Sequence, residues 1–269
     1  MKRIMVQLYE IQEPREADRL IALGVDRIGS VILSPETWKI PTVRDVVRLV
    51  RGSGAKSSLI PLLAREDDIL RALDYYQPDF VHFCEWIPLD PEKCAQREAV
   101  CAEAIRLQRR VKREFPPLGI TRSIPIPEPG LTDPAPVRET ILEIARTLEP
   151  HTDGFMTDTL RGYGGEGAAQ PVAGYVGITG EVCDWDLATA LVEASHIPVI
   201  LAGGISPENV FDAIGRVKPA GIDSCTQTNA RDNRGRPIRF RKDFDRVRRL
   251  LDEVRRAEEA YSNLRPSAL

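Results

Sequence analysis

The chain lacks several features that assign a protein to a class at once. Its 37 Lys and Arg residues are outnumbered by 40 Asp and Glu residues, so the net charge is −3 and no basic excess exists to neutralise nucleic-acid phosphates. No apolar run approaches the roughly 20 residues that a membrane span needs. The N-terminal residues also lack the apolar core of a signal peptide, because Glu10 and Glu13 follow within a few positions. We therefore expect no nucleic-acid partner, no membrane partner and a cytoplasmic location.

Paired cysteines and a dinucleotide fingerprint are missing as well. The five cysteines are odd in number and never take a C-x-x-C spacing, which argues against a disulfide framework or a zinc site and favours a reducing compartment. No G-x-G-x-x-G follows the first apolar run. The sequence therefore predicts no cofactor.

What the sequence does have is a repeat of short β-branched runs and amphipathic helical stretches. The strands are expected at Ile4–Tyr9, Arg27–Leu33, Ser57–Leu62, Phe80–Cys84, Leu118–Ile124, Gly154–Asp158, Pro198–Leu201 and Gly221–Asp223. The helices are expected at Glu13–Ala22, Thr42–Arg51, Glu66–Tyr76, Pro91–Arg113, Ala135–Leu148, Asp184–Ala194, Pro207–Val217 and Lys242–Ala260. Eight strand–helix pairs without a dividing linker predict the α/β class and a single (β/α)8 TIM barrel domain over residues 1–269, with a doubly wound open sheet as the alternative.

In such a barrel the reacting groups lie at the carboxyl ends of the strands and in the loops that follow. Asp158 ends the sixth predicted strand, and two glycine clusters follow it, at 162–167 and 177–180. The loop Leu160–Val176 therefore has the composition of a lid or of a backbone cradle for an anion. The alternative is a surface loop without a chemical role.

A second glycine pair, Gly203 and Gly204, lies between the seventh strand and its helix. Glycines at this place let the backbone approach a ligand closely, and the helix start offers free N–H groups to a phosphate. Ser206 is expected to cap that helix, with Pro207 as its first residue.

Several stretches resemble the phosphoribosylanthranilate isomerase family. The resemblance runs through Val6–Ala17 and the GVDRIG that begins at Gly24, DFVHF from Asp79, Asp158-Thr159, GITGEVCDW from Gly177, LAGGISPENV from Leu201, and Val217-Lys218-Pro219 with Gly221-Ile222-Asp223. This family consists of barrel enzymes that carry out an Amadori rearrangement of a phosphorylated sugar, an aldose-to-ketose isomerisation. The resemblance implies that Asp158 is the general acid that protonates the ring oxygen. It also implies a phosphate site, for which we predict Gly177, Thr179, Gly180, Gly203, Gly204, Cys225 and Thr226.

The chain departs from the family at chemical positions. Tyr9 stands where the family has its catalytic cysteine, the base that takes the sugar C2 proton, and Glu10 stands where a glycine follows it. Trp38 and Lys39 replace an arginine, Cys225-Thr226-Gln227 replaces Ser-Ser-Gly, and the loop after Asp158 is roughly a dozen residues longer than the family spacing implies. We therefore predict Asp158, Glu10 and Tyr9 as the catalytic residues, with Glu10 or Tyr9 in the place of the missing cysteine.

Three functions stay open at this point. The first is an isomerase of a small phosphorylated sugar, with a homodimer as the candidate oligomeric state. The second is a metal-dependent lyase or epimerase acting on a small carbonyl compound, because carboxylates and a histidine lie near strand ends. Its candidate ligands are Glu10, Glu36, His82, Glu85 and Asp158, although His82 alternates with apolar residues and also fits a buried core position. The third is a ligand-binding relative that has lost its reaction.

Overall fold

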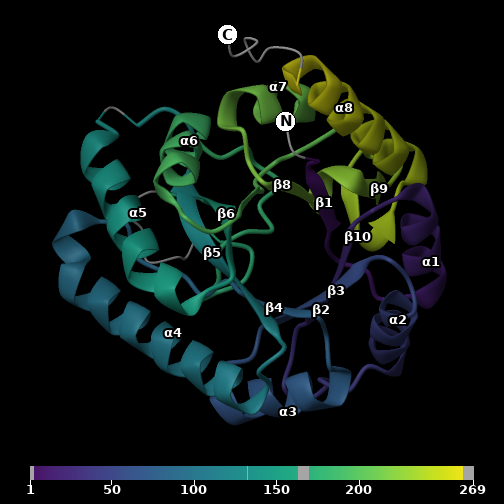
Figure 1. Ribbon diagram of the computed structural model, residues 1–269, viewed down its shortest axis with the longest axis horizontal. Helices are drawn as coiled ribbons and strands as arrows, with labels where there is room; N and C mark the ends of the chain where they lie inside the picture. Colours follow the sequence, from purple (N-terminus) through teal and green to yellow (C-terminus); the bar gives the residue numbers. More distant parts are fainter. Residues whose placement is uncertain (1–2, 132, 163–169, 263–269) are drawn as a thin grey trace, which may run out of the picture.

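The computed structural model describes residues 3–131, 133–162 and 170–262, which form a closed barrel of eight parallel strands inside a ring of helices (Figure 1). The barrel strands are β1 Met5–Leu8, β2 Arg27–Ile32, β3 Lys56–Pro61, β4 Phe80–Phe83, β5 Gly119–Pro127, β6 Gly154–Leu160, β7 Val199–Leu201 and β8 Gly221–Ser224. The helices are α1 Pro14–Leu23, α2 Pro41–Arg51, α3 Glu66–Tyr76, α4 Cys94–Glu114, α5 Ala135–Leu148, α6 Trp185–Ala194, α7 Val210–Val217 and α8 Phe244–Ser262. Strand β1 pairs in parallel with both β2 and β8, which closes the barrel and confirms the predicted fold class.

Alternation along the strands separates an apolar outer shell from a polar barrel interior. In β1, Val6 and Leu8 are fully buried and belong to the apolar core that the helices cover. Gln7 points the other way, because its amide contacts Met156 and Asp223 across the barrel. Tyr9, two residues further on, lies on the same inner face as Gln7. Polar side chains on the inner face therefore fill much of the barrel interior.

Helix α2 shows why the surrounding helices form where they do. Pro41 occupies its first turn, where a missing N–H costs nothing, and four valines follow at helical spacing. Val43, Val46, Val47 and Val50 are all buried against the barrel. The hydrophobic stripe thus fixes which face of the helix contacts the strands.

The strands and helices lie within a few residues of their predicted bounds, with two differences near the site. Helix α7 begins at Val210 and not at Pro207, because residues 206–209 form a turn in which the Ser206 carbonyl accepts from the amide of Val210 at 3.0 Å. Asn209 is the residue directly before the helix, and Ser206 Oγ accepts from the amide of Glu208 at 3.2 Å, so Ser206 caps the turn that leads into α7. Strand β6 runs on to Leu160, two residues past Asp158, which therefore lies within the strand.

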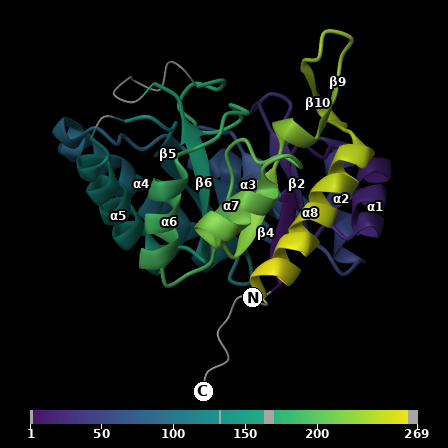
Figure 2. The same ribbon diagram turned by 90° about the horizontal axis from the view of Figure 1, so that it is seen from above.

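A two-stranded hairpin that the sequence reading missed follows β8. Strands β9 (Asn229–Arg231) and β10 (Pro237–Lys242) pair antiparallel, and Figure 2 shows them standing above the barrel, on the side opposite the C-terminal end of α8. The turn between them contains Gly235 with φ 77°, a left-handed conformation that glycine adopts readily. Among the helices in the described part of the chain, none combines the length and apolar character that crossing a bilayer requires.

Candidate functional site

Two adjoining cavities open at the carboxyl ends of the strands. The glycine-lined cavity is formed by Asp158, Thr159, residues 177–180, residues 202–205, Asp223 and residues 225–227. The central cavity is formed by Tyr9, Glu10, Val31, Ile60, His82, Cys84, Met156, Asp158, Val176, Ile178, Asp223 and Cys225. Four residues line both cavities, namely Asp158, Ile178, Asp223 and Cys225. A ligand that fills both would therefore pass directly over the two aspartates.

Backbone in the left-handed region lines the first cavity. Gly203 and Gly204 have φ values of 93° and 60°, and Gly180 has 73°. A Cβ on Gly203 would lie 2.3 Å from Thr159 Oγ1, and a Cβ on Gly204 would lie 2.6 Å from the backbone nitrogen of Val182. Only glycine both adopts these left-handed conformations readily and fits the space at these positions. Loops of this kind present backbone N–H groups to an anion.

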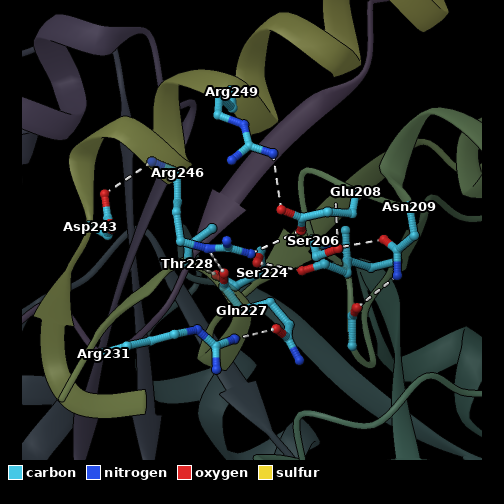
Figure 3. Close-up of polar contacts among 12 residues, drawn as sticks. Ser206, Glu208, Asn209, Ser224, Gln227, Thr228, Arg231, Asp243, Arg246 and Arg249 are labelled. Carbon is cyan, nitrogen blue, oxygen red and sulfur yellow. Dashed lines mark hydrogen bonds and ion pairs between the residues drawn. The ribbon is translucent and has the colours of Figure 1, made fainter. Parts of the chain in front are cut away.

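Ion pairs with α8 hold the rim of the glycine-lined cavity (Figure 3). Glu208, in the loop after β7, pairs with Arg246 at 2.9 Å and with Arg249 at 3.0 Å. Arg246 Nε also donates to the backbone carbonyl of Gln227, after β8, at 2.8 Å. The loops that follow β7 and β8 are thus tied to one helix, which sets the distance between the two sides of the cradle.

Asp158 presents a buried carboxyl group to both cavities. It is 8% exposed, and Ser123 on β5 donates a hydrogen bond to its Oδ2. Burial raises the pKa of Asp158 well above the usual carboxyl range, against the lowering effect of the Ser123 hydrogen bond, and the nearby charge of Asp223 adds to the rise. Gly177 leaves room for the group, because a Cβ there would lie 2.5 Å from Oδ1. A carboxyl group in this state can hold a proton and donate it to a ligand.

Asp223, on β8, is the second carboxyl group shared by the cavities. It is 6% exposed, and its Oδ1 accepts a hydrogen bond from Gln7 Nε2 at 3.1 Å. Burial raises the pKa of Asp223 to about 7, while the Gln7 hydrogen bond and the charges of Lys242 and Arg27 lower it. The mouth therefore contains two buried carboxyl groups that both keep their protons to higher pH than an exposed aspartate does.

A chain of hydrogen bonds crosses the central cavity and ends on Asp158. The Tyr9 hydroxyl lies 2.7 Å from Ser58 Oγ and 3.1 Å from His82 Nδ1. His82 Nε2 lies 2.7 Å from Ser123 Oγ, which in turn is bonded to Asp158. Strands β3, β4, β5 and β6, together with the end of β1, each supply one member, so the whole chain is fixed by the barrel.

The protonation state of His82 sets the direction of these bonds. Burial lowers the pKa of His82 to about 3, so the ring is neutral and has one donor and one acceptor nitrogen. Because Ser123 donates to Asp158, its oxygen accepts from His82 Nε2, and Nδ1 accepts from the Tyr9 hydroxyl. Every member has its partner, so His82 occupies the buried core position that its apolar neighbours allowed.

Glu10 lies at the rim of the central cavity with a strained backbone. Its φ is 68°, a region that glycine favours and other residues enter at a cost. The side chain is 2% exposed and is engaged by the hairpin, since Oε1 pairs with Arg239 Nε and Oε2 accepts from Asn229 Nδ2 at 3.0 Å. Lys242 completes the contact by donating to Asn229 Oδ1 at 2.6 Å. Glu10 thus anchors the hairpin to the barrel.

The structure brings all ten predicted catalytic and phosphate-binding residues to the two cavities. Gly177, Thr179, Gly180, Gly203, Gly204, Cys225 and Thr226 all line the glycine-lined cavity, and Tyr9, Glu10 and Asp158 line the central one. The loop predicted as a lid, Leu160–Val176, contains residues 163–169, which lie outside the described residues.

The metal-site alternative finds no support in the structure. Among the residues that the structure describes, no group of three His, Cys, Asp or Glu side chains could hold a metal ion. Glu36 contacts Ser34 at the exposed end of β2, and Glu85 is paired with Arg122. Glu10 is engaged by Arg239.

Sequence reasoning missed Asp223, Ser123 and Arg239 as parts of the site. A signal existed for Ser123, a polar residue within an otherwise buried strand, and for Asp223, the last acidic residue of the eighth strand. Arg239 could not be found, because the hairpin that brings it to Glu10 was not predicted.

Comparison with known proteins gives one consistent family. The sequence model of N-(5'-phosphoribosyl)anthranilate (PRA) isomerase matches residues 142–226, which span β6 to β8. The isomerase of Methanosarcina acetivorans is 26% identical over 256 residues, covering 93% of this chain and 92% of the relative. That of Haloferax volcanii is 36% identical over 127 residues, covering 47% and 49%.

Solved structures agree on the fold. The N-(5'-phosphoribosyl)anthranilate isomerase of Pyrococcus furiosus superposes with a TM-score of 0.64 at 18% identity, covering 95% of this chain and 99% of that one. A thiamine phosphate pyrophosphorylase from the same organism reaches 0.55 at 16% identity. Structural likeness at these identities therefore shows the barrel, while the sequence relatives and the family model show that the chain is similar to N-(5'-phosphoribosyl)anthranilate isomerases.

Proposed function

We propose that the protein is an isomerase that converts a 5-phosphorylated, N-linked ribose derivative from the aldose to the ketose form, with N-(5'-phosphoribosyl)anthranilate as its substrate. The observation that supports this most is the junction of the two cavities. There the glycine backbone that suits a phosphate adjoins the buried carboxyl group of Asp158. The relatives carry the name of the same reaction.

The phosphate is proposed to lie in the glycine-lined cavity. Its ligands would be the backbone N–H groups of the loops containing Gly180, Gly203 and Gly204, together with the hydroxyl of Thr226. The ribose would then extend over Asp158 into the central cavity. The aromatic amine would lie beyond it, near Ile178 and Tyr9.

Asp158 is proposed as the general acid. It gives its proton to the ring oxygen of the ribose, which breaks the bond between that oxygen and C1 and leaves a C1=N iminium group. Loss of the C2 proton then forms an enolamine, and protonation at C1 yields the 2-ketone. C1 is reduced and C2 is oxidised within one molecule, so no external oxidant or reductant enters.

The contacts of Tyr9 and Glu10 assign them supporting roles in this proposal. The Tyr9 hydroxyl donates to His82, and burial raises its pKa well above 10, so it does not serve as a neutral-pH base. Both carboxylate oxygens of Glu10 are engaged by the hairpin. Tyr9 would therefore orient the chain that ends on Asp158, and Glu10 would fix the rim of the central cavity.

The direct test is an assay of the purified full-length protein with N-(5'-phosphoribosyl)anthranilate. The fluorescence of the anthranilate group is followed, and the product is identified by mass and NMR. The proposal expects saturable conversion to the deoxyribulose phosphate. Failure to convert this substrate over the background rate would contradict the assigned substrate, and binding of inorganic phosphate without any turnover would favour the ligand-binding alternative.

The predicted cytoplasmic location and homodimer stay predictions. A relative from Thermotoga maritima is described as a dimeric isomerase from which monomers were generated. Light scattering on the eluate of a sizing column would give the oligomeric state of this chain.

A further inference from the structure

We propose that Asp223 is the general base that removes the C2 proton. The inference rests on the proposed isomerase function and assigns the one reacting group that this function leaves open. Asp223 lies on β8, which pairs directly with β1, the strand that precedes Tyr9. It lines both cavities together with Asp158.

The geometry leaves one carboxylate oxygen of Asp223 available. Gln7 Nε2 holds Oδ1 at 3.1 Å, and Gln7 is the residue directly opposite Asp223 in the β1–β8 pairing. Over the ranges that the structure describes, no donor is hydrogen-bonded to Oδ2. The carboxylate is therefore held in place at one oxygen while the other can accept a proton from a ligand.

The other candidate groups in the mouth are excluded by their chemistry. Burial raises the pKa of the Cys84 and Cys225 thiols, which keeps both sulfurs protonated at neutral pH. His82 has both ring nitrogens engaged, and Tyr9 donates its hydroxyl hydrogen to His82. Asp223 is thus the mouth group that combines an accessible lone pair with a location facing Asp158.

The two aspartates then divide the reaction between them. Asp158 donates its proton to the ring oxygen as the ring opens, and Asp223 takes the proton from C2 as the C1=N group accepts the electron pair of the C2–H bond. The proton on Asp223 is then available for C1 of the enolamine. As C1 is protonated, the C2 hydroxyl releases its proton and becomes the ketone. Asp158 is reprotonated by that proton through solvent, and the hydroxyl formed by ring opening keeps its own, so protons balance over the cycle.

The surroundings of Asp223 give the reaction a defined pH dependence. The charged and titratable groups facing it are Arg27 from β2, Tyr9 after β1, Asp158 from β6, Cys225 after β8 and Lys242 from β10. Burial outweighs the two cations and raises the pKa of Asp223 to about 7. Because the base must be ionised, kcat/KM should rise as the pH increases through about 7. It should fall again only where Asp158, whose pKa is also raised, loses its proton.

The test compares Asp223→Asn with wild type and with Asp212→Asn, an exposed aspartate on α7 that serves as the matched control. Turnover of N-(5'-phosphoribosyl)anthranilate by Asp223→Asn should fall by roughly 10² or more. The ligand for the binding control is reduced 1-(o-carboxyphenylamino)-1-deoxyribulose 5-phosphate, which is bound in a solved isomerase structure. The affinity of Asp223→Asn for this ligand, measured by calorimetry, should stay within about threefold of wild type, because a tenfold change would mean a lost binding contact. Asp212→Asn should behave as wild type in both measurements.

A second variant distinguishes a base from a merely structural aspartate. Gln7→Met removes the hydrogen bond that lowers the pKa of Asp223, so the rising limb of the kcat/KM profile should move to higher pH. An aspartate with only a structural role would leave the position of this limb unchanged.

The outcomes separate the two proposals. Suppose that the wild type is active but Asp223→Asn keeps a third or more of its activity, or that the rising limb of the kcat/KM profile does not move in Gln7→Met. Either result would overturn the role of Asp223 and leave the isomerase function standing. An inactive wild type would overturn both. Should Asp223→Asn fail to fold, the Gln7→Met profile alone decides.

Discussion

The two sides of the barrel mouth differ in what lines them: main-chain loops on one side and side chains on the other. On the side of β6 to β8, main-chain loops line the cavity, with Gly180, Gly203 and Gly204 in left-handed conformations. On the side of β1 to β5, side chains do so, through the hydrogen-bonded chain from Ser58 to Ser123. A backbone cradle needs only glycine and a fixed loop spacing, whereas a side-chain network changes with each residue. Substitutions therefore affect the first side through the backbone conformation and the second side through the loss of a hydrogen-bond partner.

The boundary between the two sides runs through Asp158. It belongs to β6 yet accepts its hydrogen bond from Ser123 on β5. Asp223 lies at the other boundary between the two sides, because β8 pairs with β1 and Gln7 on β1 donates a hydrogen bond to its carboxylate. Both acidic groups thus combine a place on the glycine-lined side with a partner on the other side.

The largest expected effect comes from removing the acid at this boundary. Asp158→Asn should lower turnover by roughly 10² or more, since the amide keeps the shape of the carboxyl group but has no proton to give to the ring oxygen. Phosphate affinity, measured by calorimetry, should change little. Asp74→Asn, on the exposed face of α3, is the control for the same chemical change. Full activity in Asp158→Asn would remove this residue from the mechanism.

A substitution confined to the glycine-lined side should reduce phosphate affinity more than it reduces turnover. Gly204→Val places a Cβ 2.6 Å from the Val182 nitrogen and 2.7 Å from the Glu181 carbonyl carbon, so the loop after β7 must shift. Affinity for inorganic phosphate should fall by roughly tenfold or more, about 1.4 kcal/mol, with an unchanged circular dichroism spectrum. Gly54→Val is the matched control, because a Cβ on Gly54 meets open space. Equal phosphate affinity in both variants would show that the cradle lies elsewhere.

Damage confined to the hairpin anchor should reduce stability more than activity. Glu10→Gln removes the buried charge that faces Arg239 but keeps an acceptor for Asn229, and Arg239, at 41% side-chain exposure, can turn to water. The free energy of unfolding should fall by about 1 to 3 kcal/mol, measured by urea denaturation. Arg236→Gln, which loses a pair at the exposed hairpin turn, is the control. A 10²-fold loss of turnover at unchanged stability would instead make Glu10 the base.

The smallest effect is expected from shortening the hydrogen-bonded chain. Tyr9→Phe leaves Ser58 and His82 without the hydroxyl that joins them, at a cost of about 1 to 2 kcal/mol in stability. Turnover should fall by less than about tenfold, because Asp158 keeps its bond from Ser123. Rapid-quench assays at several pH values would measure this. A loss as large as that of Asp158→Asn would place the phenol at the reacting atoms.

The barrel was predictable because its signals are local and repeated. Each strand is a short buried run, and each helix has an apolar stripe such as the valines of α2. The glycine-lined cavity was predictable for a related reason, since the glycines follow strands whose ends must meet at one face.

The other side of the mouth was less predictable, because its features depend on pairs far apart in sequence. His82 bonds Tyr9 and Ser123 across the barrel, and neither partner follows from spacing. The φ of 68° at Glu10 and its ion pair with Arg239 depend on a hairpin that is 219 or more residues downstream. The roles expected of Glu10 and Tyr9 rested on strand ends alone, which locate a residue without showing what it contacts.

The most direct measurement of the central claim follows the hydrogen at C2. Wild-type protein is incubated with N-(5'-phosphoribosyl)anthranilate deuterated at C2, and NMR and mass spectrometry locate the label in the product. Removal of the C2 proton by a mouth carboxylate predicts a 2-keto product that forms more slowly than from unlabelled substrate, with the deuterium divided between C1 and solvent because the proton on the carboxylate can exchange. Release of free anthranilate with the deuterium still on C2 would mean that the site cleaves the N-glycosidic bond, and this result would contradict the account.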